Sequence, residues 1–403
     1  MLARPAPSFL GLPAVQTVFE VMRKAGGEAR LVGGCVRDHM MGRVVDEADI
    51  DMAVNLPIEK VVSAAKQADI RVLETGLAHG SVTLMIAGRA IEVTQTRADI
   101  APDGRHSEIG FTADWYEDAQ RRDFTMNALY LDEAGQLYDE VGGLADLQEM
   151  NLRFIGDAAA RIDEDYLRIL RAVRFVGQMP ELRLSQEALM PMAQKAEKLR
   201  QLSGERIHAE LKKSFSSKGW QKSAALMHET AIDQTLFGAA FIMNNIMENG
   251  DDFDQRIAEH WLVRLASLLS KEALIAQGEA LRFSTNEKQM ISQITKSFSD
   301  DEWAVLTSDK WAEYAYHEPL YLAERAFVFM RHHHAAILMD DKRLRQIALF
   351  TPPPCPVTGH DLLQAGVPAG KSLGTLLKTA KSHFAASQFK ASKDEILSHL
   401  LGQ

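Results

Sequence analysis

The segment from Leu31 to Asp51 constrains the fold of this 403-residue chain more than any other. Leu31-Val32 predicts the end of a short apolar strand. Gly33-Gly34 predicts a turn at which the backbone can approach a ligand closely. Residues 36–41 predict a helix start, whose free N–H groups and dipole would face the same place, and Arg37 adds a guanidinium fork suited to phosphate oxygens. The segment therefore predicts a phosphate-binding corner, although a glycine pair alone is also typical of ordinary turns.

A pair of carboxylates follows this corner. Side chains alternate between the two faces of a strand, so Asp49 and Asp51 are expected on one face. Ile50 and its alternating apolar neighbours would face the core. Two adjacent carboxylates repel each other unless a cation lies between them, and their oxygens suit Mg²⁺. A pair of such ions could hold the attacking and leaving oxygens of a phosphoryl transfer. We therefore predict that Asp49 and Asp51 are catalytic residues that bind metal.

Composition sets the broad class of protein. A hydrophobic content of 46% and a charged content of 25% are ordinary for a globular chain with two to four domains. No apolar run is long enough for a membrane span, and the first residues lack a secretory signal pattern. The two cysteines, Cys35 and Cys355, lie far apart, which predicts a reduced, cytoplasmic protein.

The charge distribution is uneven along the chain. The net charge of −10 argues against a polyanionic partner when the chain is taken as a whole. Residues 151–220, however, contain 13 Lys and Arg against 9 Asp and Glu. This basic middle is compatible with RNA bound along one face, although a solvated helix face has the same composition.

The order of the expected elements predicts an α+β fold. We expect helices at 14–26 and 58–68, and strands at 30–33, 49–54, 71–73, 81–86 and 91–94. After a boundary turn near residue 141, helical periodicity dominates to the end, and the prolines at 351–356 set off a short tail. The predicted parts are a small α/β head (1–145) and an all-helical neck (146–220), body (221–350) and tail (351–403).

The polar stretch 97–119 reads as a long loop. Long loops inside compact domains are usually functional or disordered. It lies between the carboxylate strand and the next charged motif, so the sequence predicts either a mobile lid over the site or a simple surface loop.

Two further motifs carry charge. Arg121–Leu129 places Arg122, Asp123 and Asn127 among apolar residues, where they could contact a sugar and phosphates. Such a stretch is also typical of a salt-bridged helix start.

The second motif, 162–175, predicts one helix. Arg168 would pair with Glu164 and Asp165, while Arg168, Arg171 and Arg174 form a stripe. These three arginines carry more charge than the two carboxylates neutralise, which favours an anionic ligand over intrahelical salt bridges alone. A carboxylate beside a guanidinium could also match a nucleobase edge.

These motifs, in this order, resemble those of the class II tRNA nucleotidyltransferase and bacterial poly(A) polymerase family. Leu31–Asp38 with Asp49-Ile50-Asp51 is similar to its metal motif, and Arg121–Leu129 is similar to its ribose motif. Glu164–Arg168 is similar to its base-selecting motif, and Leu202–Ile207 to a further helical motif. The resemblance covers roughly residues 15–215 closely and is looser beyond.

The resemblance implies an enzyme that adds CCA to the 3′ end of tRNA from CTP and ATP, without a template. Asp49 and Asp51 would bind two Mg²⁺ ions, and Gly34 and Arg37 would hold the triphosphate. The RNA 3′-hydroxyl would attack the α-phosphate and pyrophosphate would leave. Glu92 is a candidate for a third carboxylate in the base role.

The resemblance also assigns the remaining nucleotide contacts. Arg122 and Asp123 would contact the nucleotide around its ribose. Asp165 and Arg168 would bind the base edge, with Glu164 orienting Arg168. The full set of predicted nucleotide-binding residues is Gly33, Gly34, Arg37, Arg122, Asp123, Asn127, Glu164, Asp165, Arg168, Arg171 and Arg174, the last two toward phosphate.

Several alternatives stay open. A poly(A) polymerase would use the same site, and so would an enzyme that adds only C or only A. The stretch 97–119 favours full CCA addition, because the family links this loop to the switch from C to A. From other classes, we consider an inactive RNA-binding protein and a metal-dependent hydrolase suggested by His332–His334 and His360-Asp361, although these histidines lack partners at ligand spacing. No membrane partner is expected, and the sequence specifies no oligomeric state.

Overall fold

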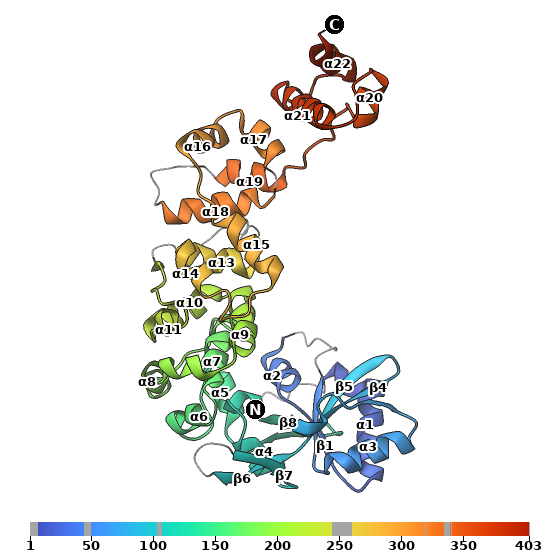
Figure 1. Cartoon of the computed structure of the whole chain (residues 1–403). Helices are drawn as coiled ribbons and strands as arrows, with labels where there is room; N and C mark the ends of the chain where they lie inside the picture. The colour runs from blue at the N-terminus through green and yellow to red at the C-terminus, as the bar shows by residue number, and fades with distance from the viewer. Residues whose placement is uncertain are drawn as a thin grey trace. The chain divides into compact units, whose positions relative to one another are not determined.

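The computed structural model describes residues 7–43, 50–102, 107–243, 260–318, 320–333, 339 and 341–402. The chain forms two compact units, Met1–Thr235 and Leu236–Gln403. Figure 1 shows the strands gathered in the N-terminal part, while helices make up the rest. The predicted α+β class with a sheet-containing head is therefore confirmed. The finer division at residues 145, 220 and 350 stays a prediction.

A seven-stranded sheet, in the order β3-β4-β5-β2-β1-β8-β9, organises the first unit. Its strands are β1 (Ala29–Val32), β2 (Asp51–Val54), β3 (Arg71–Leu73), β4 (Ser81–Ile86), β5 (Arg89–Gln95), β8 (Leu129–Leu131) and β9 (Leu137–Asp139). Only β2 and β5 are paired in parallel; the other neighbours are antiparallel. The register aligns Val32 with Asp51 and Asp51 with Glu92.

The two faces of this sheet have different covers. On one face α1 (Pro13–Lys24) and α3 (Ile58–Gln67) pack against the strands. Helix α1 does so because Val15, Val18 and Met22 recur at helical spacing and are fully buried. The other face carries a cluster that includes Val32, Ala53, Trp115 and Tyr130, to which α4 (Trp115–Gln120) contributes its tryptophan. The candidate site, which includes Asp51 and Asp118, lies next to this cluster.

The stretch predicted as a long loop is a hairpin. Strands β6 (Arg97–Pro102) and β7 (Ser107–Phe111) form a two-stranded antiparallel sheet, and α4 follows, capped by the Asp114 carboxylate. The prediction of a long loop was therefore wrong. Ile109 and Phe111 do alternate with other residues on β7, but the strands are short and lie among charged and turn-forming residues, so the stretch read as a loop.

Helices complete the first unit, and no strand of the sheet follows β9 within the described ranges. They are α2 (Gly34–Met41), α5 (Gly143–Glu149), α6 (Ala158–Glu164), α7 (Leu167–Gln178), α8 (Gln186–Gln194), α9 (Gly204–Ser216), α10 (Trp220–Glu229) and α11 (Ile232–Phe237), with short 3₁₀ turns η1 (Ser8–Gly11), η2 (Leu77–His79), η3 (Thr125–Asn127) and η4 (Ala196–Gln201). Helix α11 begins in the first unit and ends in the second. Helix α7 packs against both α9 and α10. The single helix predicted over 162–175 is wrong, because Asp165 adopts extended angles (φ −153°, ψ 105°) between α6 and α7.

The secondary-structure elements of the second unit are all helices within its described residues. Its elements are α13 (Trp261–Leu268), α14 (Lys271–Ala276), α15 (Thr285–Ile294), α16 (Asp300–Thr307), α17 (Trp311–His317), α18 (Leu322–His332), α19 (Asp341–Leu349), α20 (Gly359–Gln364), α21 (Lys371–Ala386) and α22 (Lys393–Leu401). After the proline-rich break, α20–α22 share a small core around Leu362, Phe384 and Ile396. None of the helices in the described ranges is long and apolar enough to cross a membrane.

Candidate active site

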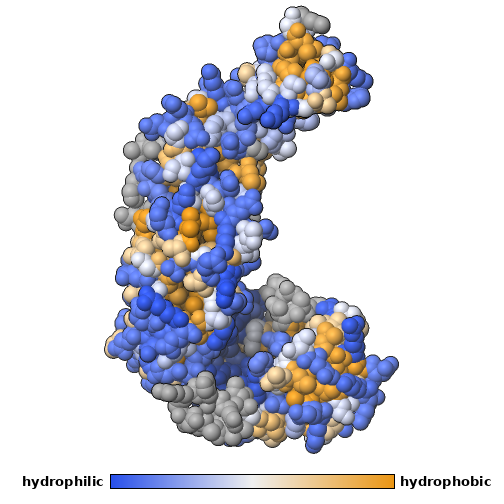
Figure 2. Space-filling view, viewed as in Figure 1, coloured by the Kyte–Doolittle hydropathy of each residue, from blue (hydrophilic) through white to orange (hydrophobic). Residues whose placement is uncertain are grey.

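A cleft of about 860 Å³ opens in the first unit, and Figure 2 shows hydrophilic side chains around the hollow there. Its lining residues are Gly33, Gly34, Cys35, Arg37, Asp38, Asp51, Arg97, Asp118, Arg121, Arg122, Asp123, Asn127, Asp165, Leu167, Arg168, Arg171, Arg174, Phe175, Arg206 and Lys213. Nine of these side chains are basic and five are acidic. The cleft is thus positive in a chain of net charge −10, which favours a polyanionic ligand there.

The predicted nucleotide-binding residues meet in this cleft with one exception. Every residue of the predicted set lines the cleft except Glu164, which accepts a hydrogen bond from the cleft residue Arg168. Asp51 lines it as well. Asp49 lies outside the described residues.

The glycine turn forms one wall of the cleft. Gly33 has φ 77° and ψ −130°, which side chains rarely adopt, and it caps the N-terminus of α2. One turn into the helix, Arg37 donates from Nε and Nη2 to the two Asp38 carboxylate oxygens at 2.9 and 3.0 Å. Its Nη1 donates to Asn127 Oδ1 at 2.9 Å. The guanidinium is therefore held in one orientation beside the free N–H groups of the helix start.

Carboxylates line the adjacent strand ends. Asp51 is exposed at the start of β2, whereas Met52 and Val54, which the alternation assigned to the core, are fully buried. Because β5 runs parallel to β2 and aligns Glu92 with Asp51, the two carboxylates project from the same face. Both are exposed at adjacent strand positions. Hard oxygen donors on one face are the ligands that Mg²⁺ prefers, so the residues present fit such an ion.

Cys35 lies between the turn and this strand. Its thiol donates to the Val32 carbonyl oxygen at 3.4 Å. Burial raises the pKa of the thiol to about 11. It therefore stays protonated at neutral pH and is no nucleophile.

A buried network joins the glycine turn to the arginine helix. Asn127 donates from Nδ2 to Asp123 Oδ1 at 3.1 Å while its own oxygen accepts from Arg37. The other oxygen of Asp123 accepts from Arg171 Nε at 2.6 Å. Burial raises the pKa of Asp123, but the Arg171 guanidinium and the hydrogen bonds from Asn127 and Phe124 outweigh it, so the pKa lies below its ordinary value. The carboxylate is thus ionised and fully engaged.

A second buried group fixes Arg122. Its Nη2 donates to Asp118 Oδ2 at 3.0 Å and its Nε donates to the Tyr130 hydroxyl at 3.1 Å. Burial raises the pKa of Asp118. The Arg122 guanidinium and the hydrogen bond from the Tyr130 hydroxyl lower it by more, so the pKa lies below its ordinary value. Arg122 is held on the floor of the cleft.

The base-selecting motif differs from the predicted helix. Arg168 Nη1 donates to Glu164 Oε2 at 2.6 Å, as the i,i+4 spacing predicted. Asp165, by contrast, leaves the helix and does not pair with Arg168. Its Oδ2 accepts from Arg206 Nη2 at 2.8 Å, and its Oδ1 accepts from the Leu167 backbone N–H at 3.0 Å. The break turns the Asp165 carboxylate into the cleft with its own cationic partner.

The arginine stripe also has partners that the sequence reasoning missed. Arg171 pairs with Asp123, and Arg174 Nε donates to Glu210 Oε2 at 2.7 Å. The expectation that Glu164 and Asp165 were the only neutralising groups was therefore wrong, because long-range contacts supply two more carboxylates. The surplus of positive charge resides in the cleft as a whole rather than in this stripe.

Six cleft residues with charged side chains were absent from the predicted set: Asp38, Arg97, Asp118, Arg121, Arg206 and Lys213. Arg206 belongs to the Leu202–Ile207 motif, and Lys213 follows it by seven residues on α9, the spacing of one helix face. No sequence pattern identified Arg97 as a cleft residue, because it lies in the stretch that was predicted to be a loop.

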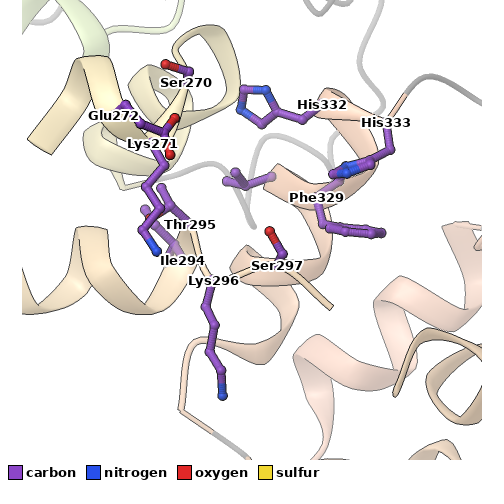
Figure 3. Close-up of a pocket in the computed structure, with 11 residues that line it drawn as sticks. Ser270, Lys271, Glu272, Ile294, Thr295, Lys296, Ser297, Phe329, His332 and His333 are labelled. Carbon is purple, nitrogen blue, oxygen red and sulfur yellow. The ribbon is translucent and has the colours of Figure 1, made fainter. Parts of the chain in front are cut away.

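A smaller cavity in the second unit bears on the hydrolase alternative. It has a volume of about 220 Å³ and is shown in Figure 3. His332 points from α18 toward Ser270, and its Nε2 lies 2.7 Å from the Ala266 carbonyl oxygen. His333 stacks on Phe329 with ring centroids 4.0 Å apart. Across the part of the chain that the structure describes, no three His, Cys, Asp or Glu side chains converge as a metal site, and His334 lies outside that part.

Two family models of known proteins match separate parts of the chain. Residues 29–153 match the family described as the poly A polymerase head domain. Residues 181–240 match the family described as the probable RNA and SrmB-binding site of polymerase A.

Curated relatives extend the match to nearly the whole chain. The mouse protein named CCA tRNA nucleotidyltransferase 1, mitochondrial, is 31% identical over 98% of this chain and 92% of its own length. The Lactococcus lactis protein named CCA-adding enzyme is 26% identical over 96% of this chain and 95% of its own length.

Solved structures share the fold. The Bacillus stearothermophilus CCA-adding enzyme in complex with CTP has a TM-score of 0.72 at 24% identity and covers 97% of this chain and 98% of that one. The Thermotoga maritima CCA-adding enzyme complexed with tRNA has a TM-score of 0.73 at 20% identity, covering 99% and 98%.

Proposed function

Because this chain belongs to the CCA tRNA nucleotidyltransferase family, we propose that it adds CCA to the 3′ end of tRNA from CTP and ATP without a template. The observation that supports this best is the positive cleft. It brings together a glycine turn, an exposed carboxylate, and the separate Asp165 and Arg168 side chains, which are the groups that such a reaction needs.

The triphosphate would bind at the glycine turn. Free N–H groups at the start of α2 face the cleft, and Arg37 is oriented beside them by Asp38 and Asn127. Arg171 and Arg174 extend this positive surface along α7. Their partners Asp123 and Glu210 hold them in place for phosphate contacts.

The carboxylates would hold divalent metal. Asp51, with Asp49 and with Glu92 as a candidate third ligand or base, supplies oxygen donors that fit Mg²⁺. Such ions stabilise charge on the α-phosphate and on the leaving group. The RNA 3′-hydroxyl would attack the α-phosphorus, the bond to the β-phosphate would break, and pyrophosphate would leave. Glu92 would accept the hydroxyl proton.

The base would be selected by Asp165 and Arg168. Cytosine and adenine each carry an exocyclic amino donor, whereas uracil and guanine carry a carbonyl at the matching position. The Asp165 carboxylate can accept from an amino group, but it repels a carbonyl. Arg206 holds that carboxylate in place, and Glu164 does the same for the Arg168 guanidinium.

The ribose would be bound near Arg122 and Asp123. Both oxygens of Asp123 already accept hydrogen bonds from the protein. We therefore propose that Asp123 contributes chiefly by orienting Arg171 and Asn127 toward the nucleotide. A cytoplasmic location stays a prediction, since the mouse relative is named as mitochondrial.

The test is nucleotide addition to a tRNA transcript that ends before CCA. The transcript is incubated with Mg²⁺ and each nucleoside triphosphate singly and together, and the 3′ ends are sequenced. Products that stop at CCA support the proposal. An A tract grown on any RNA would make the chain a poly(A) polymerase, and C-only or A-only products would make it a partial enzyme. No addition to any RNA would favour the inactive RNA-binding protein.

A matched pair of variants tests the carboxylate. Asp51→Asn should abolish addition and leave the circular dichroism spectrum unchanged, because the side chain is exposed and its volume is kept. Glu59→Gln removes an exposed carboxylate from α3, on the opposite face of the sheet, and should retain full activity. Full activity of Asp51→Asn would exclude Asp51 as a metal ligand.

A further inference from the structure

We infer that Arg97 binds a backbone phosphate of the RNA strand being extended, on the side of the carboxylates opposite the glycine turn. This inference rests on the proposed function, because it takes the cleft as the place where an RNA 3′ end meets a nucleoside triphosphate.

Arg97 begins β6, and its backbone and side chain are both hydrogen-bonded to the head. Its backbone N–H donates to Asp118 Oδ1 at 3.0 Å, and its Nη1 donates to the His79 carbonyl oxygen at 2.9 Å. The side chain lines the cleft. Its Nε is buried and has no hydrogen-bond partner among the described residues. The His79 carbonyl engages only one of the five guanidinium N–H donors, which leaves others for a phosphate oxygen.

The charges around Arg97 point to an anion. Burial and the neighbouring Arg121 and Arg122 lower its pKa to about 10, while Asp118 and Glu92 oppose this shift. The guanidinium therefore stays charged at neutral pH among like charges. Asp118 is already paired with Arg122, so it does not neutralise the group by itself. A phosphate would supply the missing negative charge.

The strand order separates Arg97 from the glycine turn. Gly33 follows β1, Asp51 begins β2 and Glu92 lies on β5. His79, which accepts from Arg97, lies two residues before β4. Across the sheet, β4, β5, β2 and β1 are successive neighbours. Across the sheet, the carboxylates thus lie between β1, which the glycine turn follows, and β4, which the His79 partner of Arg97 precedes.

The chemistry of the transfer assigns the two flanks. The attacking and leaving oxygens of a phosphoryl transfer lie roughly in line, on opposite sides of the phosphorus. With the triphosphate at the glycine turn, the attacking hydroxyl must come from the side of β5 and β4. The RNA strand that carries this hydroxyl would then pass Arg97.

The test uses Arg97→Gln in the full chain, with Arg71→Gln as the matched control. Arg71 is an exposed arginine on β3 that lies outside the cleft. Binding of a tRNA transcript lacking CCA is measured without nucleotide over a range of salt concentrations. For Arg97→Gln we expect the Kd for RNA to rise about tenfold, the cost of one charged hydrogen bond. The slope of log Kd against log salt should fall by about 0.7 to 1, as for one lost phosphate contact. The KM for CTP should change less than twofold.

Three results would overturn the inference. A raised KM for CTP with unchanged RNA binding would assign the phosphate to the nucleotide. Wild-type values for both would exclude a phosphate contact. A lower Tm in both Arg97→Gln and Arg97→Lys, with the wild-type salt slope in each, would make Arg97 a structural anchor of the hairpin. If the inference holds, Arg97→Lys keeps the charge and restores the slope. Because RNA binding is measured without nucleotide, the result is independent of whether CCA or poly(A) is the product.

Discussion

Glu210 offers a measurable link between the fold and the cleft. Its carboxylate lies on α9, outside the cleft, and pairs with Arg174 on α7, with only 6% and 11% of the two side chains exposed. Removing one member of a buried ion pair costs roughly 3–5 kcal/mol, because the other charge is left without a partner. Arg174 would keep Gln178 Oε1 at 3.0 Å and the Phe175 ring at 4.2 Å. We therefore expect Glu210→Ala to destabilise the first unit by the lower figure, about 3 kcal/mol.

The assay is urea unfolding of the full chain, with hydrogen exchange of α7 and α9 amides to report on the first unit. Glu210→Gln keeps an acceptor and should cost about 1 kcal/mol. The double variant Arg174→Met with Glu210→Leu replaces the pair by apolar side chains and should recover most of the loss. The reasoning would be refuted if Glu210→Ala were as stable as the wild type. It would also fail if the double variant were no more stable than Glu210→Ala, since an unpaired buried charge would then not be the cause.

Other expected outcomes concern selectivity, pH and the turn. Arg168→Ala should raise UTP and GTP misincorporation, measured by 3′-end sequencing, with a smaller change in the KM for CTP; unchanged fidelity would remove the base-reading role. The lowered pKa values of Asp118 and Asp123 stabilise the fold above the ordinary carboxyl range. That stability is lost as the pH falls through their depressed values, so urea midpoints should stay level to about pH 4 and then drop; a drop already between pH 6 and 5 would contradict this. Gly33→Ala should cost roughly 1–3 kcal/mol at its positive φ and raise the KM for both nucleotides. Wild-type kinetics would argue against the turn as the triphosphate site.

Local patterns predicted much of the head. The alternation that assigned Met52 and Val54 to the core and Asp51 to the surface holds, because strand geometry fixes which face each side chain takes. The turn at Gly33-Gly34 also lies where the sequence placed it, since few residues tolerate its angles. Such features depend only on residues close in the sequence, so they can be predicted before the fold is known.

Long-range pairing escaped the sequence. Asp123 and Arg171 are 48 residues apart, and Arg174 and Glu210 are 36 apart, so no helical spacing relates them. The break at Asp165 was missed for the same reason, because Arg206 from α9 helps hold the carboxylate outside the helix. The strands of the β6–β7 hairpin are short, and charged and turn-forming residues outnumber their apolar residues, so they read as a loop. The partners of the site charges are set by packing between α7, α9 and the head.

The Asn127 side-chain amide fixes the direction of the hydrogen bonds between Arg37 and Asp123. Its oxygen accepts from Arg37 and its nitrogen donates to Asp123, so a flipped amide would present donor to donor and acceptor to acceptor. The amide therefore has one allowed orientation in the buried network. Deamidation of Asn127, a reaction of ageing proteins, would place a second carboxylate beside that of Asp123. The two negative charges would repel each other, which would weaken the contact between the glycine turn and the arginine helix.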